Sequence, residues 1–230
     1  RPPNAKCWFS SRHAWWRMQS SAINPYLSVT IKDRLLAVFV HLNQEVAVHF
    51  SLIGLPGSGK STIGRQLAKA WKLRFVDVDH AIEQRIGCSI REFFAAHGEA
   101  AFRDIETQVL AELLQLSERC VLSTGGGAVL RPENRQALKA HSTVFYLQAL
   151  PEDIARRLRN DTTRPLMQGE DPLKRLKELQ QVRGPLYLET AHYVVDAVRQ
   201  SPTQLSRKIC MQAELAGLLP STGCCEALGD

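Results

Sequence analysis

The feature that most constrains this chain is a glycine-rich segment at residues 54–62, which matches the G-x-x-x-x-G-K-S pattern of a phosphate loop. Its glycines let the backbone curl, so that successive N–H groups point inward at a chain of phosphates. Lys60 would neutralise the β- and γ-phosphates, and the Ser61 hydroxyl would ligate Mg²⁺. The motif therefore predicts a nucleoside triphosphate site, with contacts from Gly57, Ser58, Gly59, Lys60, Ser61 and Thr62.

The segments on both sides of this loop have the pattern that the motif requires. Residues 46–53 form a short apolar, β-branched run, which predicts a buried strand. After the loop, apolar residues recur at helical spacing at Ile63, Leu67 and Ala70. Strand, loop and helix thus follow in the right order, which argues against a glycine-rich turn that matches the pattern by accident.

The size of the chain predicts one domain with extensions. It has 230 residues and 44% hydrophobic content, enough to bury one core. We expect the folded domain to span residues 46–216, with an N-terminal extension at 1–45 and a loose tail at 217–230. The extension carries +4 of the net charge of +6, which leaves the domain nearly neutral. No basic stripe is interleaved with aromatic residues, so we expect no binding to nucleic acid.

Residues 1–45 are acid-poor and contain Arg and Ser, a composition typical of organelle transit peptides. We favour a disordered arm, a misassigned start or a cloning remnant over a targeting leader. The expected location is therefore the cytoplasm, with a plastid as the alternative if these residues are a transit peptide.

The six cysteines are scattered without a C-x-x-C pair, so neither a zinc site nor a disulfide framework has the right spacing. A reducing compartment fits this usage. No segment approaches the ~20 apolar residues of a membrane helix, so no membrane partner is expected. A monomer is the default expectation.

Strands and helices alternate from residue 46 onward, which predicts an α/β fold: a three-layer α/β/α sandwich around a parallel sheet. Helix starts are marked by a capping box from Ser89 to Glu92, by Pro132 and Pro151 at first helical positions, and by Ser201 before a proline. Five strands are expected, at residues 46–53, 73–78, 120–123, 143–147 and 193–196.

Two acidic residues end the second expected strand. In open parallel sheets, ligands gather at the carboxyl ends of the strands. Strand alternation would point the carboxylates of Asp77 and Asp79 the same way, into the crevice. One would hold Mg²⁺ through water while the other accepts a hydrogen bond from a substrate hydroxyl. The alternative is a solvated strand end.

A glycine triplet, Gly125, Gly126 and Gly127, follows the third expected strand. Without side chains, its backbone N–H groups would approach a ligand directly, although an ordinary strand-to-helix turn would have the same composition. Arg103 lies one turn before Glu106, a spacing that is usually a surface ion pair.

Two further arginines follow between the fourth and fifth expected strands. A polar stretch with Gly and Pro predicts a lid at about residues 160–172 that carries Arg164. Arg183 precedes the fifth strand, and together with Arg103 it would suit a bidentate grip on a carboxylate.

In combination, these motifs resemble the shikimate kinases over roughly residues 48–215. Each motif is weak alone, and the set in this order is specific. In chain order the motifs are residues 54–62, Asp77-x-Asp79, Phe102-Arg103-x-x-Glu106, Gly125-Gly126-Gly127, Arg164-Pro165-Leu166 and Arg183-x-x-x-Tyr187-x-Glu189-x-Ala191.

The resemblance implies a phosphate-loop NTPase fold similar to the nucleoside monophosphate kinases. It also implies phosphoryl transfer from MgATP to the 3-hydroxyl of shikimate, on the route to chorismate and the aromatic amino acids. By the same resemblance, the catalytic residues are Lys60, Asp77, Asp79 and Arg164; the shikimate site is Asp79, Arg103, Arg183 and the glycines 125–127; Ser61 and Asp77 bind Mg²⁺; and Arg157 and Arg164 contact the nucleotide. Which aspartate acts as base stays open.

Three other functions compete with this one. A related small-molecule kinase, such as a gluconate kinase, would not need paired arginines against a carboxylate. A silent nucleotide-binding module would have kept the fold and lost turnover. A nucleic-acid-binding role of the basic extension would give affinity that falls steeply with salt.

Overall fold

The computed structural model of this chain describes residues 49–158 and 171–219. The expected extension at 1–45, nearly all of the expected lid and most of the expected tail lie outside the described residues. Arg164 is among the residues outside.

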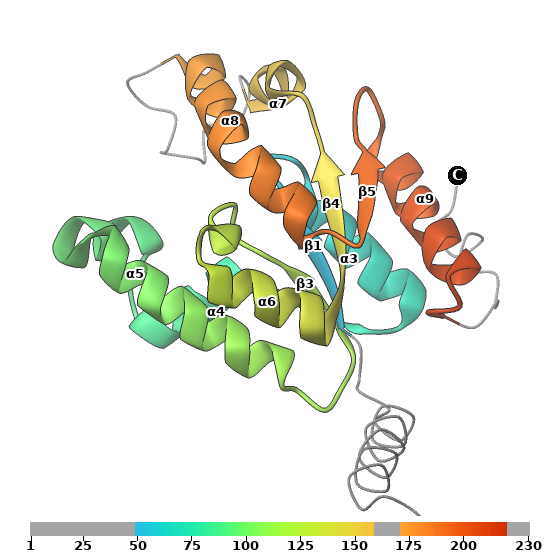
Figure 1. The fold of residues 1–230 in the computed structure, drawn as a ribbon, viewed down its shortest axis with the longest axis horizontal. Helices are drawn as coiled ribbons and strands as arrows, with labels where there is room; N and C mark the ends of the chain where they lie inside the picture. Colours follow the sequence, from blue (N-terminus) through green and yellow to red (C-terminus); the bar gives the residue numbers. More distant parts are fainter. Residues whose placement is uncertain (1–48, 159–170, 220–230) are drawn as a thin grey trace, which may run out of the picture. The chain divides into compact units, whose positions relative to one another are not determined.

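The described residues form a five-stranded parallel sheet in the order β2-β3-β1-β4-β5 (Figure 1). This arrangement confirms the predicted fold class. The strands are β1 (His49–Ile53), β2 (Arg74–Asp77), β3 (Cys120–Ser123), β4 (Ser142–Gln148) and β5 (Tyr193–Asp196). The helices are α3 (Lys60–Trp71), α4 (Val78–Ile86), α5 (Ile90–Leu114), η1 (Ala128–Leu130), α6 (Pro132–His141), α7 (Pro151–Leu158), α8 (Pro172–Thr190) and α9 (Pro202–Leu215).

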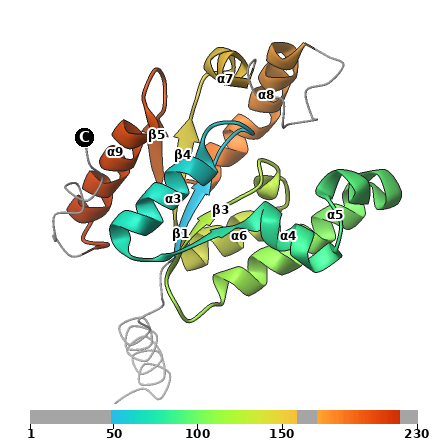
Figure 2. The same ribbon diagram turned by 180° about the vertical axis from the view of Figure 1, so that it is seen from behind.

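Helices cover both faces of the sheet and make the three predicted layers. Figure 2 shows α3 and α9 on one face, where they pack against each other, and Figure 1 shows α5, α6 and α8 on the other. Every residue of the central strand β1 is buried, as expected for a parallel strand with helices above and below it. In register, Phe50 lies between Val121 of β3 and Thr143 of β4.

The expected helix starts are confirmed. Ser89 and Glu92 form a complete capping box, and Ser201 forms a second one with Gln204. α6 and α7 begin at prolines, which need no hydrogen bond for the missing N–H at this position. One feature was not expected: Gly98 interrupts α5 with φ 79° and ψ 174°, which lies far from helical geometry.

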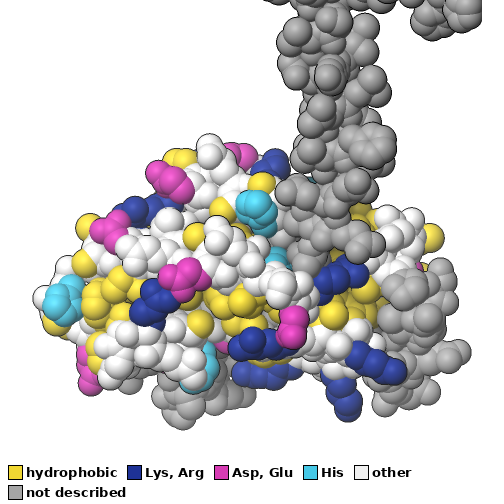
Figure 3. Space-filling model, turned by 90° about the horizontal axis from the view of Figure 1, so that it is seen from below, with side chains coloured by type: hydrophobic (Ala, Val, Ile, Leu, Met, Phe, Trp, Pro, Cys, Tyr) yellow, Lys and Arg dark blue, Asp and Glu magenta, His cyan; other side chains and the backbone are white. Residues whose placement is uncertain are grey.

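Two expectations from composition can be compared with the described part of the chain. No helix within residues 49–158 and 171–219 is long and apolar enough to cross a membrane. From the end of the sheet where the strands begin, basic, acidic and apolar side chains are intermixed on the visible face (Figure 3). That face shows no continuous basic stripe among the side chains drawn.

Candidate active site

The phosphate loop joins the end of β1 to the start of α3, and its glycines adopt backbone geometry that other residues rarely reach. Gly54, Gly57 and Gly59 have φ values of 146°, 79° and 95°. The loop is also packed tightly. A Cβ on Gly54 would lie 2.8 Å from the Leu147 carbonyl oxygen, and one on Gly57 would lie 2.9 Å from Cγ2 of Ile154. Conformation therefore favours glycine at all three positions, and space also requires it at Gly54 and Gly57.

Lys60 begins α3 and reaches back across the loop. Its Nζ donates to the carbonyl oxygens of Gly54 and Leu55, each at 2.9 Å, and the residue is buried. The positive end of the α3 dipole lies at the same place. A buried ammonium and a helix N-terminus together favour the binding of phosphate groups here.

Ser61 links the phosphate loop to the ends of two neighbouring strands. Its hydroxyl donates to Oδ2 of Asp77 at 2.7 Å and lies 3.2 Å from the Ser123 hydroxyl. Asp77 and Ser123 are the last residues of β2 and β3, which pair with each other in register. Carboxylate and hydroxyl oxygens are suitable ligands for Mg²⁺. Ser123 was not among the predicted site residues, although its position at a strand end, just before the glycine triplet, could have indicated it.

The strand argument for Asp79 was wrong. β2 ends at Asp77, and the chain turns at once into α4, so Asp79 lies in the first turn of a helix. Its carboxylate nevertheless faces the glycine triplet, because a Cβ on Gly125 would lie 2.5 Å from Oδ1 of Asp79. Burial raises the pKa of Asp79 to about 6, with a further increase from the charge of Asp77 and an opposing effect of Lys60.

Arg103 belongs to a buried ion pair, not to the surface pair that its spacing alone suggests. Its Nη1 donates to Oε2 of Glu106 at 2.6 Å, and only 1% of Glu106 is exposed. Its Nη2 and Nε donate to Oε1 of Glu99, at 3.0 and 3.2 Å. Burial raises the pKa of Glu106, whereas the charge of Arg103 lowers it. Glu106 was quoted in a motif but was not predicted as a site residue.

The glycine triplet at residues 125–127 is surrounded on all sides and has no room for side chains. A Cβ on the first glycine would meet the carboxylates of Asp79 and Glu106. One on the second would lie 2.8 Å from Cδ of Pro56, in the phosphate loop. One on the third would overlap the guanidinium group of Arg103. The triplet therefore brings the predicted substrate residues into contact with the nucleotide loop.

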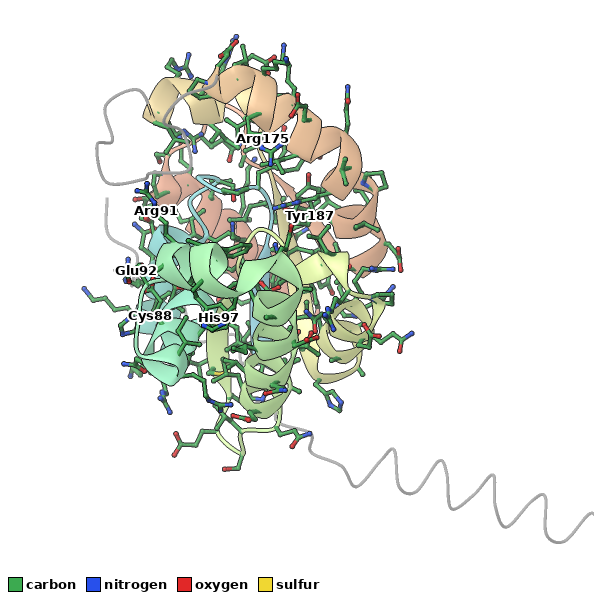
Figure 4. The ribbon with its side chains drawn as sticks, turned by 90° about the vertical axis from the view of Figure 1, so that its left-hand side faces the viewer. Cys88, Arg91, Glu92, His97, Arg175 and Tyr187 are labelled. Carbon is green, nitrogen blue, oxygen red and sulfur yellow. The ribbon has the colours of Figure 1, made fainter. Side chains whose placement is uncertain are left out.

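Arg183 approaches the same cluster from α8. Its positive charge lowers the pKa of Glu106, as does that of Arg103, so both predicted arginines lie near one buried carboxylate. Tyr187, one helical turn later, donates from Oη to the carbonyl oxygen of Gly126 at 2.6 Å. Figure 4 shows Tyr187 and Arg175 at different ends of this helix.

The predicted adenine contact lies on a separate element. Arg157 is exposed near the end of α7, and its Nη2 is 3.5 Å from the carbonyl oxygen of Ala197, just after β5. Thr62 is exposed in the first turn of α3, beside the phosphate loop. Arg164 lies outside the described residues, so its place relative to this site is not given.

Comparison with known proteins agrees with this geometry. Residues 56–214 match the family described as shikimate kinase. The shikimate kinase of Paracidovorax citrulli is 54% identical over 178 residues, which cover 76% of this chain and 96% of that protein. The structure of a shikimate kinase from Acinetobacter baumannii in complex with shikimate is 39% identical, with a TM-score of 0.69, over 74% of this chain and 94% of that one. The chain belongs to the shikimate kinase family.

Proposed function

We propose that this chain transfers a phosphoryl group from ATP to the 3-hydroxyl of shikimate, giving shikimate 3-phosphate for the synthesis of chorismate and the aromatic amino acids. The observation that carries the proposal is the contact between Gly126 and Pro56. The glycine triplet, which would form one wall of the acceptor site, therefore lies against the phosphate loop. An acceptor held against the glycine triplet therefore lies beside the phosphates that the loop would bind.

The charges around the triplet suit this acceptor. Shikimate carries one carboxylate and several hydroxyl groups. Arg103 and Arg183 would bind the carboxylate, since a guanidinium group offers paired donors that match its two oxygens. The Asp79 carboxylate lies in the first turn of α4 and also faces the triplet. It would accept hydrogen bonds from the hydroxyl groups of shikimate.

The loop residues would supply the charge that phosphoryl transfer requires. In a loose transition state, negative charge spreads over the equatorial phosphoryl oxygens, so fixed cations lower the barrier. Lys60 provides one such cation, and Arg164 would provide another from the lid. The oxygens of Ser61 and Asp77 would hold a Mg²⁺ ion, which when bound would supply positive charge to the phosphates.

The geometry favours Asp79 over Asp77 as the group that accepts the hydroxyl proton. Asp77 already accepts a hydrogen bond from Ser61, toward the phosphate side. Asp79 faces the triplet, and its pKa of about 6 leaves it ionised at neutral pH while keeping it more basic than an ordinary aspartate. The transferred proton would therefore go to Asp79.

The remaining parts of the proposal rest on the sequence pattern and on the resemblance. Arg157 contacts the nucleotide near the adenine. The catalytic domain spans residues 46–216, with the lid at about residues 160–172. The enzyme acts as a monomer in the cytoplasm.

The test is ATP consumption by the purified protein with Mg²⁺, coupled to pyruvate kinase and lactate dehydrogenase. Shikimate and gluconate are added separately, and a reaction without acceptor gives the background rate. Turnover that depends on shikimate and not on gluconate supports the proposal. Turnover with gluconate alone, or ATP binding without turnover on either acceptor, would overturn it.

A further inference from the structure

Tyr187 is a buried residue of the last motif for which the reaction itself gives no task. Its side chain is fully buried, and its hydroxyl donates to the carbonyl oxygen of Gly126 at 2.6 Å. Gly126 is the middle residue of the glycine triplet and packs against Pro56 of the phosphate loop. The hydroxyl thus ties α8 to the glycine triplet, which lies against both the phosphate loop and the predicted substrate residues.

Arg183 lies one helical turn before Tyr187 on α8. Burial strongly raises the pKa of the Tyr187 phenol, while the positive charge of Arg183 acts in the opposite direction. The phenol gives its proton to the carbonyl oxygen of Gly126. The phenol therefore lies between a substrate arginine and the substrate wall.

The helical hydrogen-bond ladder of α8 lacks one bond next to these two residues. Pro185 lies between Arg183 and Tyr187 within α8 and has no N–H for the helical hydrogen-bond ladder. A contact outside the helix therefore adds to what fixes this turn against the rest of the site. The hydrogen bond from Tyr187 to Gly126 is such a contact.

The position of the Tyr187 ring is set by a second buried tyrosine. Tyr146 of β4 stacks on it with ring centroids 5.1 Å apart and an interplanar angle of 27°. The Tyr146 hydroxyl accepts a hydrogen bond from Gln180 of α8 at 3.3 Å. The two tyrosines are thus alike in burial and in contact with α8, but within the described residues the hydrogen bond to the triplet comes from Tyr187.

We propose that Tyr187 is a positioning residue for the acceptor: its hydroxyl holds the turn of α8 that carries Arg183 against the backbone of Gly126, in the arrangement that binds the shikimate carboxylate. This inference rests on the proposed function. Tyr187 is not one of the groups proposed to react. We therefore expect its substitution to weaken the binding of the acceptor and not the binding of ATP.

The two tyrosines provide a matched experiment. Tyr187→Phe and Tyr146→Phe each remove one buried hydroxyl and keep the ring. We expect Tyr187→Phe to raise KM for shikimate about tenfold, the size of one lost hydrogen bond, and to change KM for ATP less than about twofold. Tyr146→Phe should leave both constants within about twofold, while the melting temperatures of the two variants fall by similar amounts.

A double-mutant cycle tests whether the effect passes through Arg183. In an Arg183→Ala background, Tyr187→Phe should add less than about twofold to KM for shikimate. A full tenfold effect in that background would overturn the proposal, as would equal shifts in KM for shikimate in Tyr146→Phe and Tyr187→Phe.

Different results would contradict the proposed function and this inference. Absence of shikimate-dependent turnover in the unaltered protein contradicts the function. Turnover in that protein with no selective effect of Tyr187→Phe contradicts the inference alone. If Tyr187→Phe melts near the assay temperature, shikimate binding measured by calorimetry in the cold gives the same comparison between the two variants.

Discussion

The two halves of the site are built in different ways. The phosphate half is one contiguous loop of backbone, shaped by glycines with positive φ and crossed by the side chain of Lys60. The acceptor half is assembled from side chains on α4, α5 and α8 that surround the triplet at residues 125–127. The phosphate loop is determined by a short stretch of sequence. The acceptor half forms only when the whole fold brings distant segments together.

The halves also differ in their electrostatic state. In the phosphate half, the buried ammonium of Lys60 is held by two carbonyl oxygens. In the acceptor half, burial raises the pKa of both Asp79 and Glu106, so each carboxylate is costly to keep ionised. The buried charges of the acceptor half therefore lower the stability of the fold. A substitution that removes one of these charges should lower activity while raising stability.

The largest expected effect is in the phosphate half. Lys60→Met removes the cation that we propose neutralises the phosphates, and it should lower kcat by about 10³-fold or more. The fold should persist, because methionine keeps most of the buried length of the side chain. Steady-state kinetics and circular dichroism measure the two effects. The control is Lys69→Met, an exposed lysine at the other end of α3, which should leave kcat unchanged. Normal turnover in Lys60→Met would contradict the assignment.

The next effect tests the acceptor half alone. Arg183→Ala should raise KM for shikimate by an amount equivalent to ~2–5 kcal/mol, the cost of removing one partner of a charge-assisted pair. KM for ATP should change little, because the phosphate half does not use this residue. Arg175→Ala is the control on the same helix, since Arg175 pairs with exposed Glu178 at 3.3 Å. Equal increases for both substrates would count against the division between the halves.

A smaller effect tests whether the triplet needs empty space. Gly127 has φ −102°, so alanine is not strained there, but its Cβ would overlap the guanidinium of Arg103. Because an arginine side chain can move, Gly127→Ala should raise KM for shikimate about tenfold to a hundredfold with little loss of stability. Gly64→Ala is the opposite case: its Cβ would lie 2.6 Å from the Phe75 ring, in the core, and it should lower the melting temperature without changing KM. The reverse pattern would contradict this reading of the triplet.

The same contrast explains what the sequence could predict. The phosphate loop and the five parallel strands follow from local patterns, and the capping box at Ser89 marks its helix correctly. Asp79 was placed by strand alternation, which fails because the chain turns into α4 immediately after Asp77. The spacing of Arg103 and Glu106 could not show that Glu106 is buried, since burial depends on elements distant in the chain. The sequence predicted features that lie within one helix, strand or loop. It did not predict the contacts between these elements.

The smallest expected effect concerns the stability cost of Asp79. Its pKa in the folded protein, about 6, lies above the ordinary value of 3.8, so folding disfavours the ionised carboxylate. The sign follows from linkage: the folded state binds this proton more tightly than the unfolded state, so stability is lost as the pH rises from about 4 through about 6. Asp79→Asn removes the charge and should raise the melting temperature by a few degrees at pH 7.5, while abolishing most of the activity.

Thermal melts of both proteins between pH 4.5 and pH 8 measure this effect. The advantage of Asp79→Asn should shrink as the pH falls below about 6, because the unaltered Asp79 then becomes neutral as well. Asp104→Asn is a suitable control, since Asp104 is exposed on α5 and bonded to Arg131. An Asp79→Asn protein that is less stable than the unaltered one at pH 7.5 would show that Asp79 stabilises the fold, and the acceptor half would then not hold its charge at the expense of stability.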